Sequence, residues 1–201
     1  MKVMKFGGTS VGKPERMHQI VSLVTKEAEP VIVVLSALSG TTNALVSIGD
    51  YIAKGDRNGA KQAIDTLEAH DQSFIADLWK KPDTLSKAKG ILAEHFEFLN
   101  IILKISFSEA LSKDILAQGE LLSTKLFSTY LEEQGIDHAL LPALEFMTID
   151  SYDEPQIGSI KIRLGQLLQQ HKEKKFFVTQ GYICRNARGG VDNLKRGGSD
   201  Y

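Results

Sequence analysis

The first part of the chain, to about residue 55, alternates between short apolar runs and amphipathic segments. Residues 2–6 predict a short strand that ends at two glycines. Residues 30–37 (PVIVVLSA) are rich in β-branched side chains, as in strands buried on both faces of a parallel sheet. This order of strand, loop and helix, given twice, predicts an α/β fold with right-handed crossovers. The apolar residues at helical spacing that follow the two strands are Met17, Ile20, Val21 and Val24, then Leu45, Ile48 and Ile52.

The middle of the chain predicts helices. Residues 57 to about 107 lack strand-like runs, and Pro82 divides them into two amphipathic segments. A longer amphipathic helix is predicted from about 109 to 133, with Gly135 as its stop. The remainder predicts a strand at 138–143, a helix at 157–170 and a strand at 174–183, which would present an open edge if the sheet ended there.

The composition favours a small-molecule ligand over nucleic acid or an anionic membrane. The 24 basic and 25 acidic residues nearly cancel, which leaves a net charge of −1. The single cysteine, Cys184, excludes an intramolecular disulfide and a cysteine metal cluster, and we expect it to be a small buried hydrophobe. Apolar runs fall short of the roughly 20 residues needed to span a bilayer, and the N-terminus lacks a signal core, so we expect a cytoplasmic protein.

Candidate chemistry lies where the predicted strands end. Ligands of doubly wound sheets bind beyond the carboxyl ends of the strands, and three polar clusters fall there: 5–10 (KFGGTS), 36–43 (SALSGTTN) and the C-terminal segment. Glycines followed by a helix, with Lys5 beside them, outline a phosphate-binding loop. A Gly-Gly pair after a strand is, however, more often a tight turn. The segment is neither a Walker-type loop nor a dinucleotide-binding loop.

Glu120 is a second candidate, because it lies within an otherwise amphipathic helix beside the apolar pair Leu121–Leu122. A glutamate on a helix is normally solvated. Its apolar neighbours make partial burial conceivable, and the two interpretations stay open at this point.

The C-terminal segment offers further polar groups. Arg196 could hold a carboxylate with its planar guanidinium, Gly197 and Gly198 could expose backbone amides, and Asp200 could orient a phosphoryl donor, a metal or a lysine. The alternative is an RNA-binding Arg-Gly-Gly segment. Only two such steps occur, without an interleaved aromatic residue before Tyr201 and on a nearly neutral chain, which argues against it.

Taken together, these motifs strongly resemble those of the aspartokinases. The resemblance rests on their order and spacing over the whole chain, and KFGGTSV with RGGSDY is specific to that family within the wider amino acid kinase group. The motifs are residues 5–11, 34–37, 40–43, 119–120, 179–182 and 196–201.

The resemblance implies a three-layer α/β/α sandwich with a mainly parallel central sheet. It also implies ATP-dependent phosphorylation of the β-carboxylate of L-aspartate, the first step toward lysine, threonine, methionine and isoleucine. Magnesium would arrive as Mg-ATP, without a dedicated protein metal site. By family likeness, Lys5 neutralises charge on the transferring phosphoryl group, and the ATP phosphates are bound by Gly7, Gly8 and Ser10. The aspartate pocket is lined by Ser36 and Thr42, with Glu120 binding the substrate ammonium and Arg196 its α-carboxylate. The pocket is completed by Gly197, Gly198 and Ser199, and Asp200 orients the lysine or Mg-ATP.

The sequence departs from the family at residues 191–195. Val-Asp-Asn-Leu-Lys stands there in place of the usual Thr-Thr-Leu-Gly, and Lys195 replaces a glycine. This removes the threonine hydroxyls that the family offers to its substrate.

Family members continue beyond the Arg-Gly-Gly-Ser-Asp motif, usually into regulatory ACT domains. We therefore expect residues 1–201 to be the N-terminal portion of an amino acid kinase domain, with the aspartate-binding lobe and the phosphate loop. Such a portion should have little or no activity alone, and the complete enzyme is expected to be a homo-oligomer. Two alternatives remain: a superfamily member that acts on another acid, and a non-catalytic module that binds an amino acid.

Overall fold

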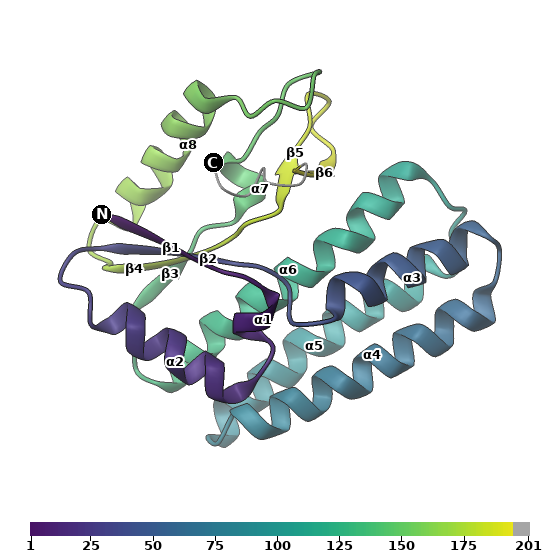
Figure 1. Ribbon diagram of the computed structural model, residues 1–201, viewed down its shortest axis with the longest axis horizontal. Helices are drawn as coiled ribbons and strands as arrows, with labels where there is room; N and C mark the ends of the chain where they lie inside the picture. The colour runs from purple at the N-terminus through teal and green to yellow at the C-terminus, as the bar shows by residue number, and fades with distance from the viewer. Residues whose placement is uncertain (195–201) are drawn as a thin grey trace.

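The computed structural model describes residues 1–194, which form a parallel β-sheet flanked by helices (Figure 1). The sheet has four strands in the order β1-β2-β4-β3, and all three pairings are parallel. Right-handed crossovers in such sheets place the connecting helices on the two faces. The strands are β1 (Lys2–Phe6), β2 (Val31–Leu35), β3 (His138–Leu140) and β4 (Phe176–Gln180).

The apolar side chains of β2 divide between the two faces of the sheet. Val31, Val33 and Leu35 lie in the larger core with α2 (Pro14–Thr25) and α6 (Glu109–Glu133). Ile32 lies in a second core against α8 (Ile157–Gln170) on the opposite face. Because successive side chains of a strand point to opposite faces, a continuous apolar run is what a strand covered on both sides requires. The predicted three-layer α/β/α arrangement is confirmed.

Four long helices extend from one side of the sheet as a helical arm (Figure 1). Two of its ends are fixed by side-chain caps: Asp56 accepts a hydrogen bond from the Gly59 amide, and Ser108 accepts one from the Leu111 amide. At the opposite end, where α6 leads back toward β3, the carboxylate of the buried Glu133 accepts hydrogen bonds from the amides of residues 80 and 81. The helical arm consists of α3 (Thr41–Ala53), α4 (Arg57–Leu78), α5 (Pro82–Ile102) and α6.

One sequence expectation needs correction, and three short features were not predicted. The strand predicted at 174–183 is β4, which lies between β2 and β3 and is therefore not an edge. Strand order depends on how the helices pack, and the local pattern carries no record of it. The pattern also did not indicate three short features: α1 (Gly8–Val11), α7 (Ala143–Phe146) and the antiparallel hairpin of β5 (Ile183–Arg185) and β6 (Val191–Asn193).

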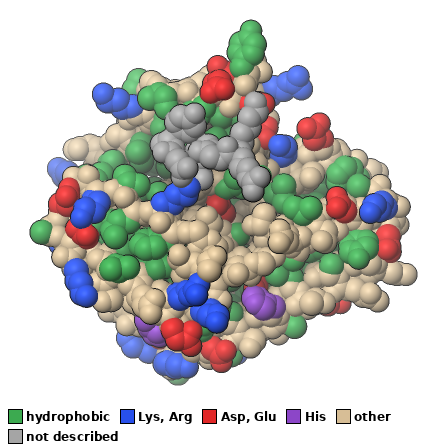
Figure 2. Space-filling view, in the orientation of Figure 1, with side chains coloured by type: hydrophobic (Ala, Val, Ile, Leu, Met, Phe, Trp, Pro, Cys, Tyr) green, Lys and Arg blue, Asp and Glu red, His purple; other side chains and the backbone are tan. Residues whose placement is uncertain are grey.

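The surface carries charges of both signs. On the face in Figure 2, cationic and anionic side chains are interspersed. Ion pairs such as Lys2–Glu27, at 2.6 Å, and Lys87–Glu132, at 2.5 Å, join neighbouring segments. None of the helices within residues 1–194 is long and apolar enough to cross a membrane.

Gly119 permits the close packing of α6 on the loop after β2 and on α3. A Cβ at this position would lie 2.9 Å from Ala37 Cβ and 3.2 Å from Leu45 Cδ1.

Gly119→Ala should therefore lower the free energy of unfolding by about 1–3 kcal/mol through overpacking, as measured by urea denaturation. Gly90→Ala on α5 is the matched control, because its Cβ would meet no atom within 4 Å. It should be neutral or stabilising by up to about 1 kcal/mol, and equal losses in the two variants would contradict this account.

Candidate active site

Three loops meet at the carboxyl edge of the sheet. β1 leads through Gly7 into α1, β2 leads into residues 36–40, and β4 leads into Gly181 and Tyr182. The Ser36 amide donates a hydrogen bond to the Phe6 carbonyl oxygen at 3.1 Å, so the first two loops leave the sheet side by side. The edge is the one at which open α/β sheets bind their ligands.

The glycine pair after β1 has two different surroundings. A Cβ at Gly8 would lie 3.0 Å from the Ala37 carbonyl oxygen, whereas one at Gly7 would meet no atom within 4 Å. Gly8 therefore lets the two loops pack, and Gly7 faces open space. The helix behind them, α1, has four residues, and the Ser10 amide is bonded to the Gly7 carbonyl oxygen at 2.8 Å.

An open polar depression of about 240 Å³ lies between these loops. Gly40, at the turn into α3, has a φ of 83°, a left-handed conformation that favours glycine. The depression brings together three of the residues singled out from the sequence, Gly8, Ser36 and Thr42, and the other lining residues are Thr9, Ala37, Leu38, Ser39, Gly40 and Asn43.

Glu120 is buried beside the loop after β4, with 4% of its surface exposed. Its Oε2 accepts the backbone amides of Gly181 at 3.0 Å and Tyr182 at 2.7 Å. Burial raises the pKa of this carboxyl from 4.5 to about 7, against the opposing effects of the backbone amides and of the Lys5 charge. The interpretation of Glu120 as a solvated surface residue is therefore wrong.

The surroundings of Glu120 are fixed by further hydrogen bonds. Thr124 Oγ1 donates to the Glu120 carbonyl oxygen at 2.7 Å and accepts from Gln180 Nε2 at 2.6 Å, and Gln180 Oε1 accepts the Ala143 amide at 2.7 Å. Ser123 Oγ donates to the Ser36 carbonyl oxygen at 2.8 Å. Sequence reasoning assigned no role to Ser123 or Thr124. Their spacing after Glu120, on the same helix, is the only signal that could have indicated one.

Lys5 lies on β1 with an exposed side chain, close enough for its charge to lower the pKa of Glu120. Lys5 and Glu120 thus lie within electrostatic range of one another. The other predicted site residues, Arg196, Gly197, Gly198, Ser199 and Asp200, lie outside the described residues.

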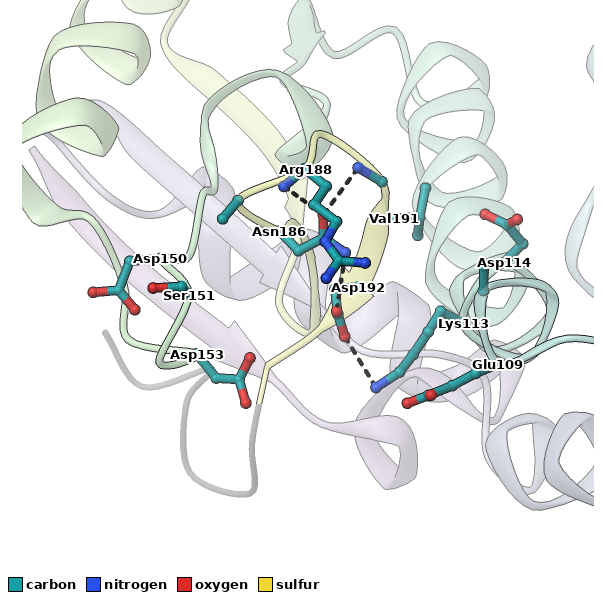
Figure 3. A pocket seen from close by; sticks show the side chains of 13 residues that line it. Glu109, Lys113, Asp114, Asp150, Ser151, Asp153, Asn186, Arg188, Val191 and Asp192 are labelled. Carbon is teal, nitrogen blue, oxygen red and sulfur yellow. Dashed lines mark hydrogen bonds and ion pairs between the residues drawn. The ribbon is translucent and has the colours of Figure 1, made fainter.

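A second cavity, of about 540 Å³, lies beside this edge between the start of α6, residues 150–153 and the β5–β6 hairpin (Figure 3). Lys113 Nζ on α6 pairs with Asp192 Oδ1 on β6 at 3.0 Å, and Asn186 Nδ2 donates to Asp192 Oδ2 at 3.3 Å. Asp192 lies within residues 191–195, and the structure shows an ion pair from this segment to α6.

The hairpin leads the chain back toward Glu120. The Leu194 amide donates to the Tyr182 carbonyl oxygen at 2.8 Å, and Tyr182 is one of the two residues whose amides hold the Glu120 carboxylate.

Cys184, on β5, is buried as expected, and burial raises the pKa of its thiol to about 12. A thiol with such a pKa is unreactive at neutral pH.

Within residues 1–194, no group of three or more histidine, cysteine, aspartate or glutamate side chains could hold a metal ion. Mg²⁺ bound to nucleotide phosphates keeps several waters and needs one or two protein carboxylates at most.

Comparison with known proteins relates the whole chain to one family. A model of the amino acid kinase family matches residues 1–201. The chain is 31% identical over 202 residues to lysine-sensitive aspartokinase 3 of Escherichia coli strain K12. The matched region covers 99% of this chain and 44% of that protein. It is also 31% identical over 200 residues to bifunctional aspartokinase/homoserine dehydrogenase 2 of the same organism, covering 98% of this chain and 24% of the relative. The chain thus spans less than half the length of these relatives.

Solved structures of aspartokinases resemble the fold of this chain. The crystal structure of E. coli aspartokinase III in complex with aspartate and ADP matches with a TM-score of 0.81 and 28% identity, over 100% of this chain and 45% of that one. Clostridium acetobutylicum aspartate kinase matches with a TM-score of 0.77 at 17% identity, a likeness that concerns the fold alone.

The raised pKa of Glu120 predicts a pH dependence of stability. Between the unfolded value of 4.5 and the folded value of about 7 the folded chain binds the extra proton, so its stability should fall as pH rises through this range. Relative to Glu120→Gln, which keeps an acceptor for the two amides, the wild-type chain should lose on the order of 2–3 kcal/mol between about pH 5 and pH 8 in urea denaturation. The comparison is between proteins because the lowered pKa of His95 adds an opposite slope that both share. Glu94→Gln, at an exposed position on α5, should follow the wild-type curve. Parallel slopes in all three proteins would contradict the assignment.

Proposed function

This chain belongs to the amino acid kinase family, and on that premise we propose that it carries the aspartate-binding and phosphate-binding part of an aspartokinase. The reaction is phosphorylation of the β-carboxylate of L-aspartate by Mg-ATP to give 4-phospho-L-aspartate, at the start of the biosynthesis of aspartate-derived amino acids. The observation that carries this proposal is the buried Glu120 carboxylate at the sheet edge, held by the amides of Gly181 and Tyr182.

The substrate chemistry fits that edge. Aspartate presents one ammonium and two carboxylates, so its pocket needs an anion, a cation and a set of hydrogen-bond donors. Glu120 is the anion for the ammonium, and the depression that contains Ser36 and Thr42 supplies hydroxyls and backbone groups. Arg196 is the proposed cation for the α-carboxylate. It follows Leu194 by two residues, and Leu194 is anchored to Tyr182 beside Glu120.

Phosphoryl transfer asks the protein mainly for positioning and for positive charge. In the proposed reaction an oxygen of the substrate β-carboxylate forms a bond to the terminal phosphorus while the bond from that phosphorus to the bridging oxygen breaks. Lys5 would neutralise charge on the phosphoryl oxygens, and the open side of Gly7, with Gly8 and Ser10, would face the nucleotide phosphates. Asp200 would orient Lys5 or the Mg-ATP, with Gly197, Gly198 and Ser199 completing the pocket.

Aspartate binding should depend on Glu120 and on pH. Glu120→Gln should weaken aspartate binding in calorimetry by about 10- to 100-fold, because a charge-assisted hydrogen bond contributes about 1.5–3 kcal/mol. With a pKa of about 7, Glu120 must lose its proton to take an ammonium, so wild-type affinity should rise with pH up to that value and the Gln variant should show no such rise. Glu94→Gln is the control and should bind as wild type does. Unchanged affinity in Glu120→Gln would rule out this role.

The catalytic part of the proposal has its own test. Because the chain spans 44% of the first relative, we expect residues 1–201 alone to show little or no acyl phosphate formation. A longer protein containing them should show it. The measurement is hydroxamate trapping with ATP, Mg²⁺ and aspartate, with other amino acids and acids as competing substrates. Aspartate binding without phosphorylation in the longer protein would favour a non-catalytic binding module, and preference for another acid would favour a different kinase of the family.

A further inference from the structure

A small cavity of about 10 Å³ lies in the helical arm, where α3, α4, α5 and α6 meet. Its apolar walls include Leu45, Leu67 and Leu99. Its polar lining consists of one side chain from each helix: Thr41 from α3, Asp71 from α4, His95 from α5 and Gln118 from α6. Asp71, His95 and Gln118 lie outside the motifs that the proposed function uses, and Thr41, although within the 40–43 motif, has no role in that function.

Three of these side chains have a polar atom without a partner among the described residues. The atoms are Thr41 Oγ1, Asp71 Oδ2 and His95 Nε2. The residues themselves are 3%, 0% and 6% exposed. Buried polar atoms in folded proteins nearly always have a hydrogen-bond partner, protein or ordered water. Three such atoms around one small cavity therefore point to a shared partner inside it.

The donor or acceptor role of each atom follows from its other contacts. Gln118 Nε2 donates to the Asp114 carbonyl oxygen at 3.3 Å, which leaves Gln118 Oε1 as the acceptor that faces His95 Nδ1 at 2.6 Å. Nδ1 therefore carries the proton, and Nε2 presents a lone pair to the cavity. Burial lowers the pKa of His95 to about 4, so this neutral form holds at neutral pH.

Asp71 and Thr41 complete the pattern. Asp71 Oδ1 lies 3.0 Å from Nδ1 of His70, whose side chain is half-exposed. This contact leaves Asp71 Oδ2 to face the cavity. The Thr41 hydroxyl can donate. The cavity thus presents two acceptors and one donor.

We propose that this cavity binds a single structural water, which donates hydrogen bonds to His95 Nε2 and Asp71 Oδ2 and accepts one from Thr41 Oγ1. The volume matches one water, because a site needs about 10–15 Å³ of such space to hold it, and internal waters typically make about three hydrogen bonds. A hard metal cation would need about six or more oxygen ligands, which the lining does not supply.

The water would connect the helical arm to two parts of the candidate active site, the polar depression and the buried Glu120. Thr41 is the first residue of α3, next to Thr42 in the polar depression, and Gln118 precedes Glu120 by two residues on α6. A bridge from Thr41 to Asp71 and His95, continued by the direct bond to Gln118, joins all four helices. The four side chains would act as positioning residues for α3, which carries Thr42, and for α6, which carries Glu120.

The direct test is a high-resolution crystal structure of the chain. We expect a well-defined density peak within hydrogen-bonding distance of Thr41 Oγ1, Asp71 Oδ2 and His95 Nε2. In solution, NMR should show the Nδ1–H tautomer of His95 and magnetisation transfer from a long-lived water to Thr41 or His95. A cavity without density, or a direct hydrogen bond between Asp71 and His95, would overturn the proposal.

Thr41→Val gives a second test, whose sign separates the two possibilities. If the water is bound, removing its hydroxyl donor should lower the melting temperature by several degrees and remove or displace the density peak. If the cavity is dry, the same change removes an unpaired buried hydroxyl and should leave stability unchanged or raise it. Thr66→Val is the matched control, because its hydroxyl is exposed and bonds only to the Gln62 carbonyl oxygen within α4. A Thr41→Val melting temperature at or above that of the control would count against the water.

Discussion

The pairing of the Glu120 carboxylate with the backbone amides of Gly181 and Tyr182 connects the two parts of this molecule. Glu120 belongs to α6, the longest helix of the arm, and the amides belong to the turn after the inner strand β4. An isolated buried charge is costly, and a carboxylate is retained in such a place only with partners. The two amides of the turn stabilise the buried carboxylate, and the carboxylate in turn holds the turn in place. The sheet edge and the helical arm are therefore fixed relative to one another.

Around this pair, each loop of the edge is tied to α6 or to its neighbour. Ser123 holds the loop after β2 through the Ser36 carbonyl oxygen, and Gln180 joins Thr124 to the start of α7. The β5–β6 hairpin is tied by the Lys113–Asp192 pair at its outer side and by the Leu194 amide at its inner side. Partly buried ion pairs contribute little free energy by themselves, so we regard Lys113–Asp192 as fixing the direction of the hairpin more than its stability.

The sequence predicted the elements of the fold better than their arrangement. The apolar runs of β1 and β2 and the helical spacing of α2 and α3 are local patterns, and the structure confirms them. The inner position of β4 and the burial of Glu120 depend on contacts between residues far apart in the chain, which periodicity does not record. Composition and pattern alone favoured a solvated Glu120, and only the resemblance to the aspartokinases pointed to the role proposed for it. Asp71 and His95 stood on helices whose pattern indicated a simple apolar core.

Under the proposed function, the raised pKa of Glu120 has a consequence for how charge enters the site. In the free chain the carboxyl is poised between its two forms near neutral pH, because burial and the backbone amides act in opposite directions. An arriving ammonium would favour the charged form and displace the proton, so the substrate itself would complete an ion pair that the protein leaves half made. A neutral ligand of the same shape could not do this. A buried glutamate poised between its two forms therefore selects for a cationic group more strongly than a solvated one, whose charge is already stabilised by water.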